Sequence, residues 1–325
     1  MPTTLRIRDI PSIIETERQN QDIVAIGDLH GDRDMFWGVM VASGCVKMKN
    51  LKGGNKKPKW IGGNTIVVCL GDTVDSARPD IKIKDNDWLN RAGEKQLQID
   101  ILDLDHMARQ HGGMVLSILG NHDIFAGNMT KGYCKDIDVA SYRDRAAAYN
   151  PGGEFAKIFG ETRNVIQIVG PCLFVHGTLK PDFMKIFPQR HNRDIVEYVN
   201  STMRRYLKGE LERIPAWFTH SQKFDVNPLE CRDYGYRVLK SDGVKEFLKT
   251  FPGEPRFMVL GHTPHPTITR LGPVICTDVA LSRAFGNKQG HYAAEWVKFV
   301  GKKAYRCGLG MDGEIDQELL KTSKR

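Results

Sequence analysis

Ile-Val-Ala-Ile-Gly-Asp-Leu-His-Gly-Asp, at residues 23–32, is the most informative stretch of the chain. Its apolar first half is typical of a buried strand, and the Gly and polar residues that follow end that strand. Asp28 and His30 stand two positions apart, so on an extended segment both side chains project to the same side and can bind one ion. Ligands of α/β proteins bind beyond the carboxyl ends of strands. The stretch therefore predicts a strand that carries two metal ligands at its end.

Similar motifs, in which Gly and a polar residue follow an apolar run, recur further along the chain. They are Gly71-Asp72-Thr73-Val74-Asp75, Gly120-Asn121-His122-Asp123, His176-Gly177 and Gly261-His262-Thr263. Carboxylate, amide and imidazole groups without a thiolate are typical ligands of a hard or borderline metal ion. A single His beside Gly is usually structural, but a series of such motifs in this order predicts one shared metal site.

These motifs resemble those of the calcineurin-like metallophosphoesterase family, and most closely its phosphoprotein phosphatase branch of the Shewanella-like or serine/threonine type. The resemblance implies an α/β metallophosphoesterase fold, with two stacked mixed β-sheets flanked by helices in a four-layer α/β/β/α sandwich. It also implies two bound metal ions (Mn, Fe or Zn), bridged by the carboxylate of Asp72. The implied ligands are Asp28 and His30 for one ion, and Asn121, His176 and His262 for the other.

The resemblance further implies hydrolysis of phosphate monoesters, by in-line attack of a metal-bridging hydroxide. The expected substrate is a phosphoprotein with phosphate on Ser, Thr or Tyr. His122 follows the implied ligand Asn121, so we expect its imidazole to face the leaving group as a general acid. Asp75 is implied as the carboxylate that hydrogen-bonds this histidine and fixes its tautomer. Two divalent ions and two carboxylates leave the site positive, which attracts a phosphate dianion.

The phosphate-binding arginines are where the chain departs from the family pattern. The family has Arg directly after the Val-Asp pair, whereas this chain has Ser76 there and Arg78 two positions later. We therefore expect Arg78 to replace the missing arginine. A second phosphate-binding arginine lies, in the family, between the two histidine motifs, and Arg232 is the best match. The planar guanidinium suits this task because it binds two phosphate oxygens at once.

Two other enzyme classes fit parts of the sequence. The same two-metal core serves diesters and anhydrides, so the main alternative is a nucleotide or dinucleoside polyphosphate hydrolase or a phosphodiesterase. Cys231 and Arg237 match the Cys-x5-Arg spacing of cysteine phosphatases. That mechanism needs a loop of backbone N–H groups around a thiolate, and the bulky residues in between include an acid, so the sequence argues against it.

The chain is expected to form a single catalytic domain over residues 20–302, with an N-terminal segment at 1–19 and a C-terminal tail at 303–325. The tail after Gly308 is expected to be poorly packed. Residues 180–232 form an insertion that is a candidate lid. Residues 47–59 hold six lysines and are expected to form a solvated loop, with weak support for nucleic-acid binding.

Apolar runs and helical patterns alternate in the order βαβαβ in the first part of the chain. The predicted strands are 23–26, 65–70, 114–119, 165–169, 172–175, 256–260, 274–277 and 295–300, and the predicted helices are 34–42, 93–110 and 193–208.

Composition supports a folded protein with an anionic partner. The 325 residues carry a formal net charge of +8, and no apolar run is long enough to span a membrane. The seven cysteines are odd in number and lack a Cys-x-x-Cys spacing, which argues against a disulfide framework. Residues 1–8 lack the apolar core of a signal peptide. The sequence therefore predicts a cytoplasmic protein that acts on a phosphorylated substrate, without a membrane partner.

Overall fold

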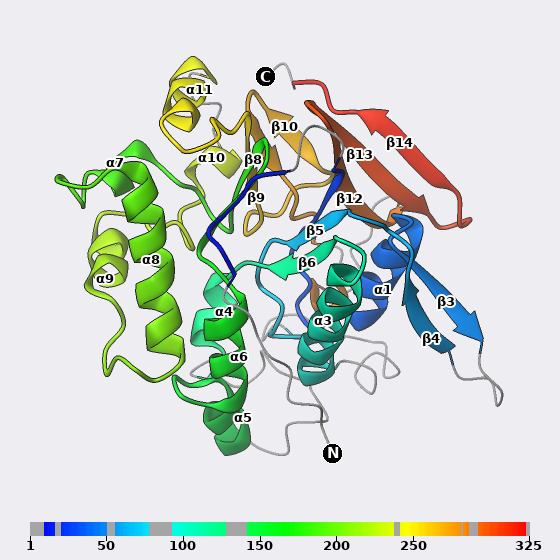
Figure 1. Ribbon diagram of the computed structural model, residues 1–325, viewed down its shortest axis with the longest axis horizontal. Coiled ribbons are helices and arrows are strands. Elements are labelled where there is room, and N and C mark those ends of the chain that lie inside the picture. Colours follow the sequence, from blue (N-terminus) through cyan, green and yellow to red (C-terminus); the bar gives the residue numbers. More distant parts are fainter. Residues whose placement is uncertain are drawn as a thin grey trace.

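The computed structural model describes residues 10–16, 21–50, 56–77, 93–127, 142–236, 241–280, 282–285 and 292–322. In this part of the chain, the strands form two six-stranded sheets and a separate two-stranded hairpin. The two sheets share an apolar layer, and helices lie on their outer sides (Figure 1). The four-layer α/β/β/α sandwich expected from the sequence is confirmed.

The first sheet has the strand order β14-β13-β12-β2-β5-β6. Its strands are β2 (Ile23–Ile26), β5 (Ile66–Cys69), β6 (Met114–Ser117), β12 (Tyr292–Val300), β13 (Lys303–Gly310) and β14 (Ile315–Leu319). The strands β2, β5 and β6 run parallel, and the other three add antiparallel neighbours on one side. The parallel strands therefore end at the same edge of the sheet.

The second sheet has the order β1-β7-β8-β9-β11-β10. Its strands are β1 (Ile13–Ile14), β7 (Ile166–Val169), β8 (Cys172–Val175), β9 (Phe257–Leu260), β10 (Thr269–Leu271) and β11 (Val274–Cys276). Here β8, β9 and β11 run parallel, while β7 and β10 are antiparallel to their neighbours β8 and β11. Both sheets are mixed, as expected.

Alternating side chains of the central strands explain the layers, because successive residues of a strand point to opposite faces. Ile23 and Ala25 of β2 lie in the apolar cluster between the sheets, together with Phe174 of β8. Val24 and Ile26 point the other way, into the cluster formed with α1 (Arg33–Ala42) and α3 (Glu94–Arg109). All four residues of β2 are buried, which explains its continuous apolar run.

The remaining helices cover the outer side of the second sheet and the loops at the strand ends. They are α4 (Asn121–Phe125), α5 (Tyr142–Tyr149), α6 (Glu154–Thr162), α7 (Pro181–Met184), α8 (Asn192–Leu207), α9 (Ala216–Lys223), α10 (Asp233–Tyr236) and α11 (Ser241–Lys249), with a 3₁₀ turn at Arg283–Phe285. None of the described helices has the length and apolar character that crossing a membrane requires.

The insertion at 180–232 packs mainly as an outer helical layer. Val196, Val199 and Met203 of α8 are buried in the same apolar cluster as Leu173 of β8. Its final residues reach the predicted site, where the backbone carbonyl of Glu230 meets a histidine. Most of the candidate lid therefore packs on the second sheet and contributes side chains to the apolar core.

One expectation about loops is wrong, and a second holds for the side chains but not for the backbone. The described residues of the segment 47–59 do not form a loop, because β3 (Val46–Asn50) and β4 (Lys56–Trp60) pair as an antiparallel hairpin. The tail after Gly308 extends the first sheet through regular antiparallel pairing of β13 and β14, but residues 311–319 are all exposed, so its side chains are poorly packed, as expected. In both cases backbone pairing, rather than an apolar run, forms the strands, and the sequence pattern shows that pairing weakly.

Candidate metal centre and catalytic site

The predicted ligands lie on loops that leave the carboxyl ends of strands from both sheets. Asp28 and His30 follow β2, Asp72 follows β5, Asn121 follows β6, His176 follows β8 and His262 follows β9. Backbone hydrogen bonds join these loops: the N–H of His30 donates to the carbonyl of Asp72 at 2.8 Å, and that of Gly261 donates to the carbonyl of His176 at 2.9 Å. The parallel strands therefore bring together residues that are far apart in sequence.

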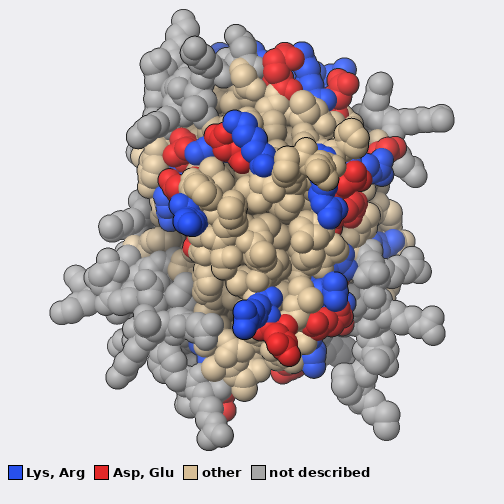
Figure 2. All heavy atoms as spheres, turned by 90° about the vertical axis from the view of Figure 1, so that its left-hand side faces the viewer, with Lys and Arg blue, Asp and Glu red and all other residues tan. Residues whose placement is uncertain are grey.

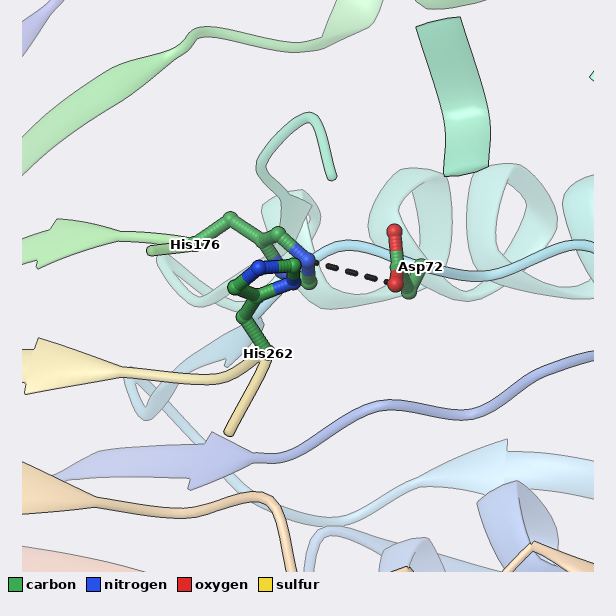
Figure 3. A group of neighbouring side chains, drawn as sticks. All are labelled: Asp72, His176 and His262. Carbon is green, nitrogen blue, oxygen red and sulfur yellow. Dashed lines mark ion pairs between the residues drawn. The ribbon is translucent and has the colours of Figure 1, made fainter. Parts of the chain in front are cut away.

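Two groups of donor atoms form at this meeting point, and Asp72 belongs to both. In each group the donor atoms lie within 4.8 Å of one another, and all the residues are buried. The groups are Asp28, His30 and Asp72, and Asp72, His176 and His262. In Figure 3, the ring of His176 points toward the carboxylate of Asp72 beside the ring of His262, and its Nε2 lies 3.2 Å from Oδ2 of Asp72. This arrangement suits two neighbouring cations that share one carboxylate.

Asn121 lies beside the second donor group. Its Oδ1 is 3.1 Å from Nε2 of His176, so an amide oxygen faces the place where that group converges. Together with the donor groups, this contact brings all six predicted ligands to one region of the molecule.

Backbone carbonyls fix the orientation of the three histidines. His30 Nδ1 lies 2.9 Å from the carbonyl of Val74, His176 Nδ1 lies 2.7 Å from that of Leu70, and His262 Nε2 lies 3.0 Å from that of Glu230. A ring nitrogen that donates to a carbonyl leaves the other nitrogen with a lone pair, which is the tautomer that binds a metal. The chemistry of the donor set, with acids and oriented imidazoles, therefore fits two divalent ions.

Burial and crowding of charge shift the pKa values at this site. Burial, together with Asp278, raises the pKa of Asp28 well above its usual range. Burial by itself would raise the pKa of Asp72, but nearby histidines, above all His176, outweigh it and hold that pKa well below its usual range. Burial would also lower the pKa of His176, but Asp72 and Asp28 raise it to about 10. The carboxylates thus attract positive charge, which a metal ion supplies in place of protons.

His262 differs from His176. Burial lowers the pKa of His262 to about 3, and the positive charges of His176 and Arg232 add to this effect. The imidazole of His262 is therefore neutral, as metal binding requires.

The backbone is strained at four of the predicted site residues. Their φ angles are positive: 40° at His30, 46° at Asp72, 65° at Asp75 and 64° at His262. Residues other than Gly rarely adopt this region. Such conformations persist where the surrounding structure enforces them, and they concentrate at functional sites. Gly71 nearby has φ of 90°, and a Cβ there would lie 2.5 Å from the backbone nitrogen of Gly120.

His122 and Asp75 form a hydrogen-bonded pair beside the donor groups. Nδ1 of His122 lies 2.6 Å from Oδ2 of Asp75, while its Nε2 faces the site, 3.9 Å from Oδ2 of Asp72. The side chain of His122 is 15% exposed, whereas that of Asp75 is fully buried. Asp75 therefore anchors the inner side of the imidazole, and the outer nitrogen is turned toward the place where a substrate would bind.

A buried arginine that the sequence analysis did not identify completes this pair. Arg145 of α5 donates from Nη2 to Oδ1 of Asp75 and from Nη1 to Oε2 of Glu94. Burial raises the pKa of Asp75, although His122 and Arg145 each lower it in part. For Glu94, burial acts in the same direction, but Arg145 outweighs it and lowers the pKa. Nothing in the local sequence distinguishes Arg145 from a surface arginine, so only the fold reveals it.

Ser76 lies inside this buried network. Its backbone N–H and its hydroxyl both donate to Oε1 of Glu94, at 2.8 and 2.9 Å, and its side chain is buried. The position at which the family has a phosphate-binding arginine is therefore turned into the protein.

Of the two predicted phosphate-binding arginines, one lies at the site. Arg232 is partly buried, and its Nη1 donates to the backbone carbonyl of His262. Arg78 lies outside the described residues.

Asp123, the last residue of the Gly120-Asn121-His122-Asp123 motif, joins two of the loops. Its Oδ1 accepts from the backbone N–H of Thr73 at 3.0 Å, and its Oδ2 accepts from that of Gly120 at 2.9 Å. It thereby fixes the Asp72 loop relative to Asn121. The acid at this motif position was visible in the sequence, but its structural role was not.

Cys231 is buried, and burial raises the pKa of its thiol. The thiolate that a cysteine phosphatase requires is therefore disfavoured. Arg237, the other residue of the Cys-x5-Arg match, lies outside the described residues.

Comparison with known proteins agrees with this geometry. The family model for calcineurin-like phosphoesterase matches residues 22–299. Shewanella-like protein phosphatase 2 of Arabidopsis thaliana is 24% identical, over 86% of this chain and 74% of its own. An uncharacterised protein of Schizosaccharomyces pombe is 25% identical, over 82% of this chain and 75% of its own.

The same fold occurs in a solved structure, the cold-active protein-tyrosine phosphatase of a psychrophilic Shewanella species. The two share 19% identity with a TM-score of 0.70, over 97% of this chain and 83% of that one. The likeness extends over nearly the whole chain, so the arrangement of the two sheets and their helices is common to both proteins.

Proposed function

This chain belongs to the calcineurin-like phosphoesterase family, and on that basis we propose that it is a phosphoprotein phosphatase that removes phosphate from Ser, Thr or Tyr with two bound metal ions. Hydrolysis of phosphoric esters follows from the family and from its phosphatase relatives. The protein substrate, the metals and the roles of individual residues are the parts that we propose. Mn, Fe and Zn all suit a donor set of imidazoles and carboxylates.

The observation that carries the proposal is that Asp72 belongs to both donor groups. A carboxylate with its pKa held well below the usual range remains ionised and can ligate two cations at once. We assign Asp28 and His30 to one cation, and Asn121, His176 and His262 to the other. When bound, two such ions activate water as a nucleophile and neutralise the oxygens of the phosphoryl group.

His122 is the proposed general acid. Its Nδ1 is held by Asp75, so Nε2 is the nitrogen that can deliver a proton to the leaving oxygen of the substrate. Its partial exposure supports this role, because the leaving group of a protein substrate must reach it from the surface.

Arg232 is the proposed phosphate-binding residue. Its guanidinium lies against the loop of His262 and offers donors beyond the one used on the carbonyl. The guanidinium of Arg232, beside the second donor group, can orient the phosphoryl oxygens before attack. The role of Arg78 remains a prediction from the sequence.

A hollow that reaches the residue after Arg232 through one of its lining lysines supports a protein substrate. It has a volume of about 420 Å³ and is lined by Lys180, Asp182, Lys185, Ile186, His220, Phe224 and Val226. Nζ of Lys180 lies 2.6 Å from Oδ2 of Asp233, the residue after Arg232, which links the hollow to the segment that carries Arg232. Apolar and charged groups together can accommodate a side chain that flanks the phosphorylated residue.

The six described cysteines are buried free thiols, which supports a reducing compartment such as the cytoplasm.

The test is a substrate panel assayed with added Mn, in which phosphoserine, phosphothreonine and phosphotyrosine peptides are compared with nucleotides and dinucleoside tetraphosphates. The proposal predicts the highest kcat/KM for a phosphopeptide, and loss of that activity in Asp72→Asn. Preference for a nucleotide or a dinucleoside polyphosphate would leave the metal chemistry in place and overturn the protein substrate.

A further inference from the structure

The hairpin of β3 and β4 has one apolar face and one basic face. Side chains alternate along both strands, so Val46 and Trp60 are buried against the cluster beneath α1 and α3, while Met48 is partly buried there. The opposite face carries only lysines among its described residues: Lys47, Lys49, Lys57 and Lys59, all exposed. The alternation in Val-Lys-Met-Lys and Lys-Pro-Lys-Trp is therefore that of a half-buried hairpin.

The register places these lysines directly opposite one another. Lys47 pairs with Lys59, and Lys49 pairs with Lys57. Residues opposite each other in an antiparallel pair have Cβ atoms about 4.5–5.5 Å apart, and like charges there are destabilising. Within the described part of the chain, no ion pair involves any of the four. The hairpin thus keeps four cations close together, and no carboxylate among the described residues neutralises them.

The face shown in Figure 2 is different. Figure 2 shows that the face formed by α7, α8 and α9 carries Lys and Arg interspersed with Asp and Glu. Two lysines there have acidic partners, since Lys185 lies 2.6 Å from Asp182 and Lys208 lies 2.7 Å from Glu210. The segment 47–59 has six lysines and no acid, so it accounts for six of the eight net positive charges of the chain. Most of the excess charge therefore lies in this segment, and four of its lysines are exposed on the described strands.

The hairpin lies at the end of the first sheet opposite to the metal centre. It is closed at its base by a hydrogen bond from the N–H of Ile61 to the carbonyl of Cys45, and the chain then enters the first residue of β5 at Ile66. Asp72 follows the last residue of that same strand. Figure 1 shows the hairpin projecting from the sandwich beside α1. The base of the hairpin therefore lies at the opposite end of β5 from Asp72, and none of its lysines belongs to the donor groups.

We propose that the lysine face of the β3–β4 hairpin binds the sugar–phosphate backbone of a nucleic acid, independently of base sequence. A nucleic acid presents a regular row of negatively charged phosphates. The protein surfaces that bind it are polar and strongly basic. The centres of protein–protein interfaces are instead depleted in Lys, which disfavours a protein partner. A membrane-binding hairpin would present apolar side chains beside its lysines, and the described residues on this face include none.

Binding of a short labelled nucleic-acid duplex, followed by fluorescence anisotropy at several salt concentrations, tests the proposal. Neutralising four phosphates gives a slope of about −3.6 for log Kobs against log[salt], or about a 100-fold loss of affinity between ~50 and ~200 mM salt. The variant Lys47→Gln/Lys49→Gln/Lys57→Gln/Lys59→Gln should bind at least about tenfold more weakly at the lower salt, with a slope close to zero. Two duplexes of unrelated sequence should bind equally.

A matched control removes the same number of charges from exposed positions outside the hairpin. We choose Lys157, Lys223, Lys302 and Lys321, each replaced by Gln. This control should retain the affinity and the salt slope of the unaltered protein. The proposal is overturned if the control loses as much affinity as the hairpin variant, if the hairpin variant binds the duplex normally, or if the protein binds anionic phosphatidylserine vesicles but no duplex in the same buffer.

Two further measurements separate lost binding from lost folding. Since like charges face each other across the hairpin, the hairpin variant should unfold at the same temperature as the unaltered protein, or higher, at low salt. Its rate with para-nitrophenyl phosphate should be unchanged, because the metal centre lies at the other end of the sheet. Reduced thermal stability in this variant would contradict the cross-strand geometry on which the proposal rests.

Discussion

Arg145 and Asp75 form an ion pair inside the protein: Nη2 of Arg145 donates to Oδ1 of Asp75, while Oδ2 of the same carboxylate lies 2.6 Å from Nδ1 of His122. The other branch of the guanidinium binds Glu94. One buried arginine therefore holds two buried carboxylates, and through one of them it fixes the ring of His122. The orientation of the proposed general acid thus depends on a buried residue that belongs to neither donor group.

Replacing Arg145 should impair the orientation of His122. In Arg145→Met, with Glu94→Gln added to avoid an unpaired buried charge, we expect kcat to fall by about 10–100-fold for an ester with a poor leaving group. The single change Arg145→Met should destabilise the fold by about 3–5 kcal/mol, because it removes the buried cation beside Glu94 and leaves Asp75 with its hydrogen bond to His122. The first effect is measured with phenyl phosphate, and the second by chemical denaturation.

A purely structural role for Arg145 makes a different prediction. It would lower the rates with phenyl phosphate and para-nitrophenyl phosphate by the same factor, whereas positioning of a general acid affects mainly the poorer leaving group. Arg145→Lys should restore part of the lost rate, because an ammonium can reach one of the two carboxylates.

Asp72→Asn should lower the occupancy of both metal positions. Asp72 contributes to both donor groups, so loss of its charge weakens each of them. The protein is stripped with a chelator and reloaded, and its metal content is measured by mass spectrometry. We expect about two ions per chain in the unaltered protein, as for a two-metal centre. Full metal content together with full activity in Asp72→Asn would contradict the bridging assignment.

His122→Asn should reduce turnover without removing metal. We expect a loss of about 10²–10⁴-fold with a poor leaving group, and a smaller loss with para-nitrophenyl phosphate, whose leaving group needs little protonation. Asp75→Asn should show the same dependence in a milder form, because it removes the charge that holds the imidazole. Metal content measured on the same samples is the control, and equal losses for both esters would rule out the general-acid role.

Ser76→Arg should destabilise the protein rather than improve phosphate binding. Ser76 is buried, and its N–H and hydroxyl donate to Glu94 beside Arg145, so an arginine there would bring a second cation into the network. Thermal unfolding should show a drop for Ser76→Arg that Ser76→Ala does not reproduce in full. A stable Ser76→Arg protein with a lower KM for phosphopeptide would instead place that side chain at the substrate.

Arg232→Lys should raise KM for a phosphopeptide more than it lowers kcat. A lysine keeps the charge but cannot bind two phosphate oxygens with a planar fork. Arg232→Met, which also removes the charge, should raise KM further. The increase in KM in Arg232→Lys therefore measures the contribution of the planar guanidinium, and the further increase in Arg232→Met measures that of the charge. Unchanged KM in both variants would exclude Arg232 from phosphate binding.

The strand-end motifs were readable from the sequence because each is local. In Gly27-Asp28-Leu29-His30, the apolar run before the motif and the polar residues within it are neighbours in the chain, so a single strand and its loop account for both. The family resemblance and the four-layer fold followed from these motifs, and both are confirmed. That the predicted ligands lie together follows from parallel strands that end at a common edge.

Other features exist only in three dimensions. The partners of Arg145 are 70 and 51 residues away, and a buried arginine has the same local pattern as an exposed one. The lysine hairpin and the strands of the C-terminal tail depend on cross-strand pairing, which backbone hydrogen bonds provide without an apolar run to mark it. Short-range sequence patterns specify which residues follow the end of a strand. Tertiary packing decides which distant charged residue lies beside them, because a buried charge is costly unless the fold provides a partner for it.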